Sequence, residues 1–113
     1  MITDAEGKGV PTQEADLYKS GIYLFMDIVN AETCKEAIEF VLKQNTEKKK
    51  QKRLQFMICS PGGAMPDCFA LIDIMKGSRI PIHTVGLGCI ASCGLLLFIT
   101  GEKGHRTLTP NTS

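Results

Sequence analysis

Hydrophobic and polar residues along this chain follow two alternating patterns, which together predict strands separated by helices. Short apolar runs occupy residues 21–29, 54–59 and 80–87 and are typical of buried strands. Residues 31–44 and 64–76 repeat apolar positions at helical spacing, and a third helix is expected from Ser92 to near Gly101. A last extended piece covers residues 106–113. Connections of helical length imply parallel strands, so we expect an α/β fold built on a parallel sheet of repeated strand–helix units.

The two longer predicted helices carry signals at their ends and along their faces. Asn30 immediately precedes the first helix and is a typical N-cap residue. The second helix has Pro66 in its first turn and stops at Gly77. The apolar stripe of the first helix is predicted to contain Ala31, Cys34, Ala37, Ile38, Val41 and Leu42. The inner side of the second is predicted to contain Met65, Phe69, Ile72 and Met75.

Two segments invite other interpretations. Residues 1–20 are polar, contain Gly and Pro, and lack the apolar core of a signal peptide, so we expect a flexible N-terminal arm before a domain at 21–113. Residues 80–100 are apolar over a length that spans a bilayer. Pro81 and three glycines interrupt this run, which favours a strand leading into a buried helix over a membrane span.

Composition and charge narrow the class of protein. The chain has 113 residues and a mass of 12.3 kDa, which corresponds to one domain. Its 13 basic and 12 acidic residues give a net charge of +1, which argues against a dedicated nucleic-acid binder. The basic run at 47–53 is expected to be a solvated helix end and loop. The five cysteines contain no C-x-x-C spacing, which indicates a reducing compartment and neither a disulfide framework nor a zinc site.

Two predicted turns place reactive groups at the carboxyl ends of neighbouring strands. The sequence S-P-G-G at residues 60–63 allows backbone N–H groups to approach a ligand closely, although it also suits a simple tight turn. Ser92 lies between a strand and a helix, as the serine of a nucleophile elbow does. Ile90 stands where the elbow motif G-x-S-x-G has its first glycine, and Ser92 is equally suited to be an N-cap.

The combination of motifs resembles the Clp protease family, within the Clp protease/crotonase superfamily. That family has S-P-G-G after one strand, a nucleophile loop G-x-A-[AS]-S-[MA]-G after the next, a G-x-K-G-x-R turn, and a strand with P-N-[ST]. The matching segments here are residues 60–63, 88–94, 101–106 and 110–112. Their order and spacing agree from about Gly21 to the end of the sequence. The resemblance implies a crotonase-like fold, incomplete at the C-terminus.

The resemblance also implies roles for individual residues. Ser92 would be the nucleophile, and the backbone N–H groups of Gly63 and Cys93 would form the oxyanion hole. In that family the general base His and its Asp follow the P-N-[ST] segment, so the resemblance places both beyond Ser113. His83, inside a strand, and His105, in a surface turn, are not expected to replace the base. The 113-residue chain is therefore expected to be inactive by itself.

The family's function gives further expectations. These are hydrolysis of unfolded proteins to short peptides inside two stacked heptameric rings, fed by an ATP-driven unfoldase. No cofactor or metal is expected in this subunit, and neither nucleic acid nor a membrane is expected as a partner. The expected location is cytoplasmic, with an organelle stroma or matrix also compatible. The loop departs from the family pattern at Cys89, Ile90 and Cys93, and the N-terminal arm lacks the usual axial-loop pattern. The alternatives are a catalytically inactive Clp-like ring subunit and a crotonase-fold acyl-CoA enzyme.

Overall fold

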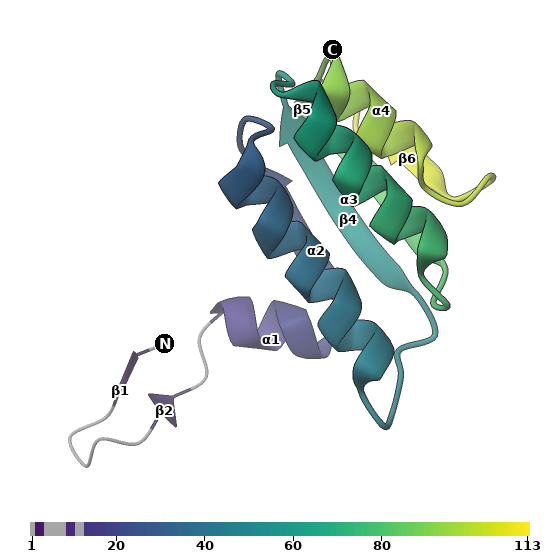
Figure 1. Ribbon diagram of the computed structural model, residues 1–113. Coiled ribbons are helices and arrows are strands. Elements are labelled where there is room, and N and C mark those ends of the chain that lie inside the picture. Colours follow the sequence, from purple (N-terminus) through teal and green to yellow (C-terminus); the bar gives the residue numbers. More distant parts are fainter. Residues whose placement is uncertain (1, 4–8, 11–12) are drawn as a thin grey trace.

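Four parallel strands form the sheet at the centre of the protein. The computed structural model describes residues 2–3, 9–10 and 13–113 (Figure 1). The sheet has the order β3 (Ile22–Met26), β4 (Leu54–Ser60), β5 (Ile82–Ile90) and β6 (Arg106–Leu108). Each neighbouring pair is parallel. The predicted α/β class and parallel sheet are confirmed.

Three helices connect these strands and cover one face of the sheet. They are α2 (Ala31–Thr46), α3 (Met65–Gly77) and α4 (Cys93–Ile99), and Figure 1 shows them side by side in front of the strands. The strands lie in the sheet in their chain order, so right-handed crossovers place every connecting helix on the same face. All three helices were predicted to within a few residues of their observed bounds.

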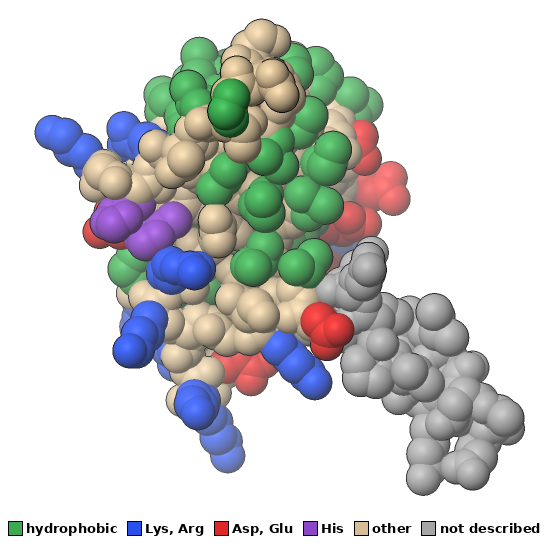
Figure 2. All heavy atoms as spheres, turned by 180° about the vertical axis from the view of Figure 1, so that it is seen from behind, with side chains coloured by type: hydrophobic (Ala, Val, Ile, Leu, Met, Phe, Trp, Pro, Cys, Tyr) green, Lys and Arg blue, Asp and Glu red, His purple; other side chains and the backbone are tan. Residues whose placement is uncertain are grey.

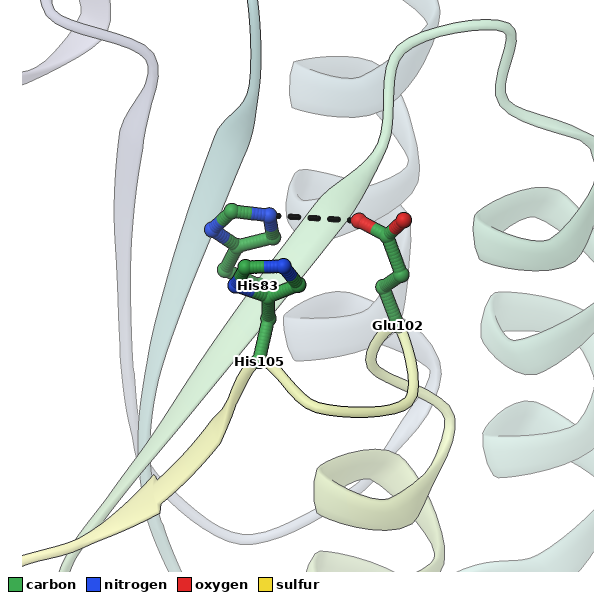
Figure 3. Close-up of side chains that lie close together, drawn as sticks. All are labelled: His83, Glu102 and His105. Carbon is green, nitrogen blue, oxygen red and sulfur yellow. Dashed lines mark hydrogen bonds and ion pairs between the residues drawn. The ribbon is translucent and has the colours of Figure 1, made fainter.

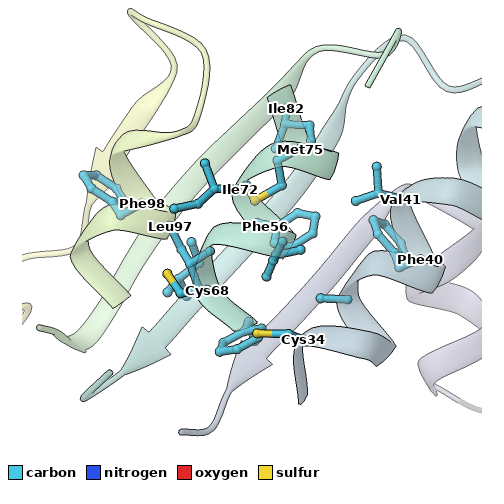
Figure 4. Packing of buried hydrophobic residues seen from close by; sticks show 14 of the residues in the cluster. Cys34, Phe40, Val41, Phe56, Cys68, Ile72, Met75, Ile82, Leu97 and Phe98 are labelled. Atoms are coloured by element: carbon cyan, nitrogen blue, oxygen red, sulfur yellow. The ribbon is translucent and has the colours of Figure 1, made fainter. Parts of the chain in front are cut away.

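The core lies between this helical layer and the sheet (Figure 4). Along β4 the side chains of Leu54, Phe56 and Ile58 are buried, while alternate residues lie on the other face, as the period of a strand requires. The ring of Phe56 lies 5.7 Å from that of Phe40 on α2, at an interplanar angle of 74°. Phe40 belongs to the buried stripe of α2, although it is absent from the predicted stripe.

The predicted inner faces of two helices need correction. Met65 and Phe69 of α3 are 41% and 50% exposed, and Leu42 of α2 is 48% exposed. The residues of α3 that are buried are Cys68, Leu71, Ile72 and Met75. Helix α3 carries apolar residues on both sides, so periodicity alone does not determine which side faces the sheet.

Asn30 caps α2 as predicted. Its Oδ1 accepts a hydrogen bond from the Thr33 backbone N–H at 2.8 Å, and the Asn30 N–H donates to Thr33 Oγ1 at 3.0 Å. This reciprocal pair is a capping box, which satisfies a donor that the first turn leaves without an intrahelical partner.

The N-terminal segment contains three elements that the sequence pattern did not predict. Residues 1, 4–8 and 11–12 of the predicted arm lie outside the described residues. Strands β1 (Ile2–Thr3) and β2 (Gly9–Val10) pair antiparallel, and α1 covers Gln13–Lys19. The Tyr18 ring lies edge-on to Phe40 at 5.9 Å, and the Gln44 side-chain amide donates to the Tyr18 carbonyl at 2.6 Å. Helix α1 is thus anchored by contacts with α2, which local sequence does not reveal.

The other face of the sheet has no helix among the described elements. Figure 2 shows hydrophobic side chains gathered on this side of the molecule. Leu24 and Met26 of β3 and Leu108 of β6 are 46%, 58% and 55% exposed.

The loop after α2, residues 47–53, is largely exposed, as expected for the basic run. No helix in the described part of the chain has the length and hydrophobicity needed to cross a bilayer.

Candidate active site

The S-P-G-G turn directly follows β4 and is fixed by its own first residue. Ser60 is fully buried at the end of the strand, and its Oγ accepts a hydrogen bond from the Gly62 N–H at 3.1 Å. Gly62 and Gly63 have φ values of 104° and 153°, a region that favours glycine. The two consecutive glycines are therefore required by the backbone of this turn.

Ser92 occupies a sharp turn between β5 and α4. Its φ and ψ angles are 52° and −122°, and it is the only non-glycine residue with positive φ among the described residues. Such a conformation costs about 1–3 kcal/mol and is concentrated at functional sites. Ser92 holds the N-cap position, but its side chain makes no capping hydrogen bond and the residue is exposed. The N-cap interpretation of its hydroxyl is therefore wrong.

The two turns lie in direct contact. A β-carbon added to Gly62 would lie 2.8 Å from Cβ of Ser92. The Ala91 N–H donates to the Ser60 carbonyl at 3.1 Å, and a β-carbon on Gly94 would lie 2.5 Å from that same oxygen. Glycine at positions 62 and 94 thus permits the close approach of two segments that are thirty residues apart in the sequence.

The amide groups of Gly63 and Cys93 both lie at this junction. Val29 donates to the Gly62 carbonyl and accepts from the Ala64 N–H, both at 2.8 Å, so the N–H and C=O of Gly63 itself are left to point away from Val29. The Gly63 carbonyl accepts from Cys93 Sγ at 3.5 Å. The Cys93 N–H belongs to the first helical turn, whose donors lack intrahelical partners. Neither amide donates a hydrogen bond to any residue within 13–113.

The side chain of Cys93 packs inward, away from solvent. It is fully buried, and its Sγ lies 3.0 Å from Met65 Sδ. The buried Cys68 thiol donates to the Cys93 carbonyl at 3.6 Å. Burial, followed by hydrogen bonding with Cys93, raises the pKa of the Cys68 thiol from its usual 9.0 to about 12. The Cys68 thiol is therefore held in the protonated form at neutral pH, which disfavours nucleophilic chemistry on its sulfur.

Both histidines of the sequence lie at the opposite end of the sheet from Ser92. His83 is the second residue of β5, whereas Ser92 lies two residues beyond the end of that strand at Ile90. At about 3.3 Å per residue, that strand separates them by roughly 25 Å. The His105 ring stacks on His83 with centroids 4.0 Å apart. Neither histidine therefore has its imidazole within hydrogen-bonding distance of Ser92.

The last residues of the sequence run beside the turn that contains Ser92. The Ser113 N–H donates to the Gly88 carbonyl at 2.8 Å, and the Ile90 N–H donates to the Ser113 carbonyl at 3.1 Å. The extended piece predicted at 106–113 is a strand only over Arg106–Leu108. Residues 109–112 form a turn before this pairing, closed by a hydrogen bond from the Thr112 N–H to the Thr109 carbonyl at 3.1 Å.

Sequence reasoning did not identify two residues that position the site. Ser60 was treated only as part of a turn, and Gly94 only as part of a motif. The signal for Ser60 is a hydroxyl at the inward-facing position of a buried strand, where it needs a partner. The signal for Gly94 is its position inside a predicted helix. Glycine disfavours a helix interior, and a close approach of another backbone segment is a frequent reason for finding it there.

A protein-family model described as Clp protease matches residues 7–113 of the chain. The match covers both turns, the strands that carry them and helix α4.

Proposed function

The chain belongs to the Clp protease family, and on that basis we propose that Ser92 is the nucleophile of a Clp-type serine endopeptidase. The observation that carries this proposal is the backbone of Ser92, with φ 52° and ψ −122°, at a strand-to-helix turn. A strained turn of this kind is how a nucleophile elbow presents its hydroxyl. The exposed Ser92 side chain, free of a capping hydrogen bond, agrees with that role.

The backbone N–H groups of Gly63 and Cys93 form the oxyanion hole of the proposed reaction. Two observations support this role. Both amides lie at the junction of the two turns, and neither donates a hydrogen bond to a residue in the described range 13–113. Ser92 Oγ attacks the peptide carbonyl carbon, its proton passes to a base, and the two amides stabilise the oxyanion. The base then protonates the leaving amine, and water releases the acyl group.

The base in this mechanism comes from outside the 113 residues. This proposal is supported by the position of His83 and His105 at the far end of the sheet, where neither can reach Ser92. Ser113 pairs with Gly88 and Ile90 beside the nucleophile turn, so residues that follow it, or a companion chain docked there, would supply the His and its Asp. Without them the 113-residue chain is expected to retain only the small residual catalysis of the oxyanion hole.

The working enzyme is an assembly of such subunits around a chamber, fed with unfolded protein by an ATP-driven unfoldase. The support for assembly is the uncovered face of the sheet, where exposed side chains from β3 and β6 form an apolar surface (Figure 2). Large apolar surfaces of this kind mark protein–protein interfaces. The subunit itself uses no cofactor and works in the cytoplasm or an equivalent organelle compartment.

The direct test is labelling of the full-length protein with a fluorophosphonate probe. Ser92→Ala is expected to abolish labelling, whereas the exposed control Ser20→Ala keeps it. Cys93→Ala keeps most of it, because Cys93 acts through its amide. Labelling that persists in Ser92→Ala would refute the assignment. An assembled wild-type protein that takes no label would point to an inactive ring subunit, and thioester turnover without peptidase activity to an acyl-CoA enzyme.

A further inference from the structure

His83, Glu102 and His105 converge at the end of the sheet remote from Ser92 (Figure 3). His83 Nε2 lies 3.2 Å from Glu102 Oε2, and the two imidazole rings stack with centroids 4.0 Å apart and planes at 4°. One nitrogen or oxygen atom from each of the three side chains lies within 4.8 Å of the others. The proposed peptidase mechanism uses none of these groups.

The backbone holds the three residues in place. The Glu102 N–H donates to the Ile82 carbonyl at 2.8 Å, and the Thr84 N–H donates to the His105 carbonyl at 3.1 Å, so the turn is attached on both sides of His83. The His105 N–H donates to the Glu102 carbonyl at 2.9 Å and closes the turn, with Gly104 at φ 88°. These hydrogen bonds fix the main chain that carries the three side chains.

Two imidazoles and one carboxylate are a donor set that suits zinc and similar divalent transition metals. We propose that His83, Glu102 and His105 bind a divalent metal ion of the zinc class, with water completing the coordination. Metal–ligand bonds of about 2.0–2.1 Å in a tetrahedral site place ligand atoms about 3.4 Å apart, so the side chains must close in. The two imidazole rings are parallel at 4°, so one of them must also rotate out of the stack for both nitrogen lone pairs to point at one ion. Glu102, whose side chain is 48% exposed, and His105, which is exposed, can turn toward His83, which is less exposed at 22%.

The metal would fasten the start of β5 to the turn that precedes β6. This is a structural role, because the site lies roughly 25 Å from Ser92 at about 3.3 Å per strand residue. The cysteine spacing gave no reason to expect zinc, and none of the three ligands is a cysteine. The site depends on side chains that meet only in the folded protein.

The test is a titration of the chelator-treated full-length protein with Zn²⁺, followed by calorimetry. The wild type is expected to bind one ion per chain. His83→Gln, Glu102→Gln and His105→Gln should each weaken binding at least about tenfold, since each removes one of three protein ligands. Lys103→Gln, in the same turn, is the matched control and should bind as the wild type does. Zn²⁺ should also raise the Tm of the wild type and the control, but not of the three variants.

Substitution of Zn²⁺ by Co²⁺ distinguishes binding at His83, Glu102 and His105 from binding at the cysteine thiols. Nitrogen and oxygen ligands give only weak visible bands, and we expect those in the wild type. An intense near-ultraviolet charge-transfer band would place the metal on cysteine and overturn the proposal. Equal affinity of wild type and His105→Gln would also overturn it and leave the cluster as a hydrogen-bonded stack. Fluorophosphonate labelling of Ser92 is independent of these readouts, so either proposal can fail alone.

Discussion

Gly62 and Ser92 are so close that a side chain at position 62 would collide with the serine: an added β-carbon would lie 2.8 Å from Ser92 Cβ. The two residues follow different strands, β4 and β5. Their contact brings the S-P-G-G turn and the strained turn at Ser92 into one site. Glycine at position 62 is thus required by space as well as by backbone conformation.

Gly62→Ala is expected to displace Ser92 and slow fluorophosphonate labelling of the full-length protein by about 100-fold, the loss that a shift of about 1 Å can cause. The φ of 104° at this position adds a strain of about 1–3 kcal/mol. Gly77→Ala is the control, because a β-carbon there meets nothing within 4 Å. A folded Gly62→Ala protein that is labelled at the wild-type rate would contradict this account of the site.

Asn30→Ala is expected to lower the free energy of unfolding by about 1 kcal/mol, because it removes the acceptor of the Thr33 N–H in the capping box of α2. Asn30→Asp keeps a side-chain oxygen in that place and should retain most of the stability. Urea denaturation at one fixed protein concentration measures both. If the Asp variant lost as much stability as the Ala variant, the cap would not be the cause.

Helices and strands of this fold could be predicted where the residues of the segment itself favour the structure that tertiary packing also favours. Asn30 marks the start of α2 because its cap is formed by residues three positions apart. Helix α1 was not predicted, since its anchors, Phe40 and Gln44, come from a different helix. Met65 and Phe69 were placed on the wrong side because α3 has apolar residues on both sides, and its contacts with the sheet decide which side is buried.

The candidate site was predictable as a set of residues but not as a geometry. The motif identified Ser92, while its φ and ψ and the unused capping position appear only in the structure. The convergence of His83 with Glu102 and His105 was likewise hidden, because strand register brings together residues about twenty positions apart. Spacing in sequence cannot encode such a contact.

The five cysteines should differ sharply in reactivity. Cys34, Cys68 and Cys93 are at most 2% exposed, whereas Cys59 and Cys89 are partly exposed. The native protein should therefore show no more than two rapidly reacting thiols with a disulfide reagent, and the denatured protein all five. Cys59→Ser should remove one of the rapid thiols, whereas Cys34→Ser should remove none. A third rapid thiol in the folded protein would contradict the observed burial.

Stability should fall at alkaline pH, and Cys68 should account for part of the fall. Burial raises the pKa of Cys68 to about 12, against 9.0 for an ordinary thiol, so the unfolded chain loses this proton first. Between these two values the folded state binds more protons, and the free energy of unfolding decreases as pH rises, by about 1.4 kcal/mol per pH unit for one group. Below pH 9 the contribution is fully present, and it is lost progressively toward pH 12.

Denaturation of wild type and Cys68→Ala at pH 8 and at pH 10.5 isolates this contribution. The wild type should lose about 2 kcal/mol more than the variant between the two values, since the variant has no thiol at position 68 to titrate. The variant itself starts less stable, because the shortened side chain leaves a small cavity beside Cys93. Titrating groups that do not interact with Cys68 cancel in the comparison, whereas Cys93 and Cys34 do interact with it, so the difference reports on this cluster of thiols. Equal losses in the two proteins would mean that Cys68 ionises in the folded state as readily as in the unfolded chain, contrary to its burial.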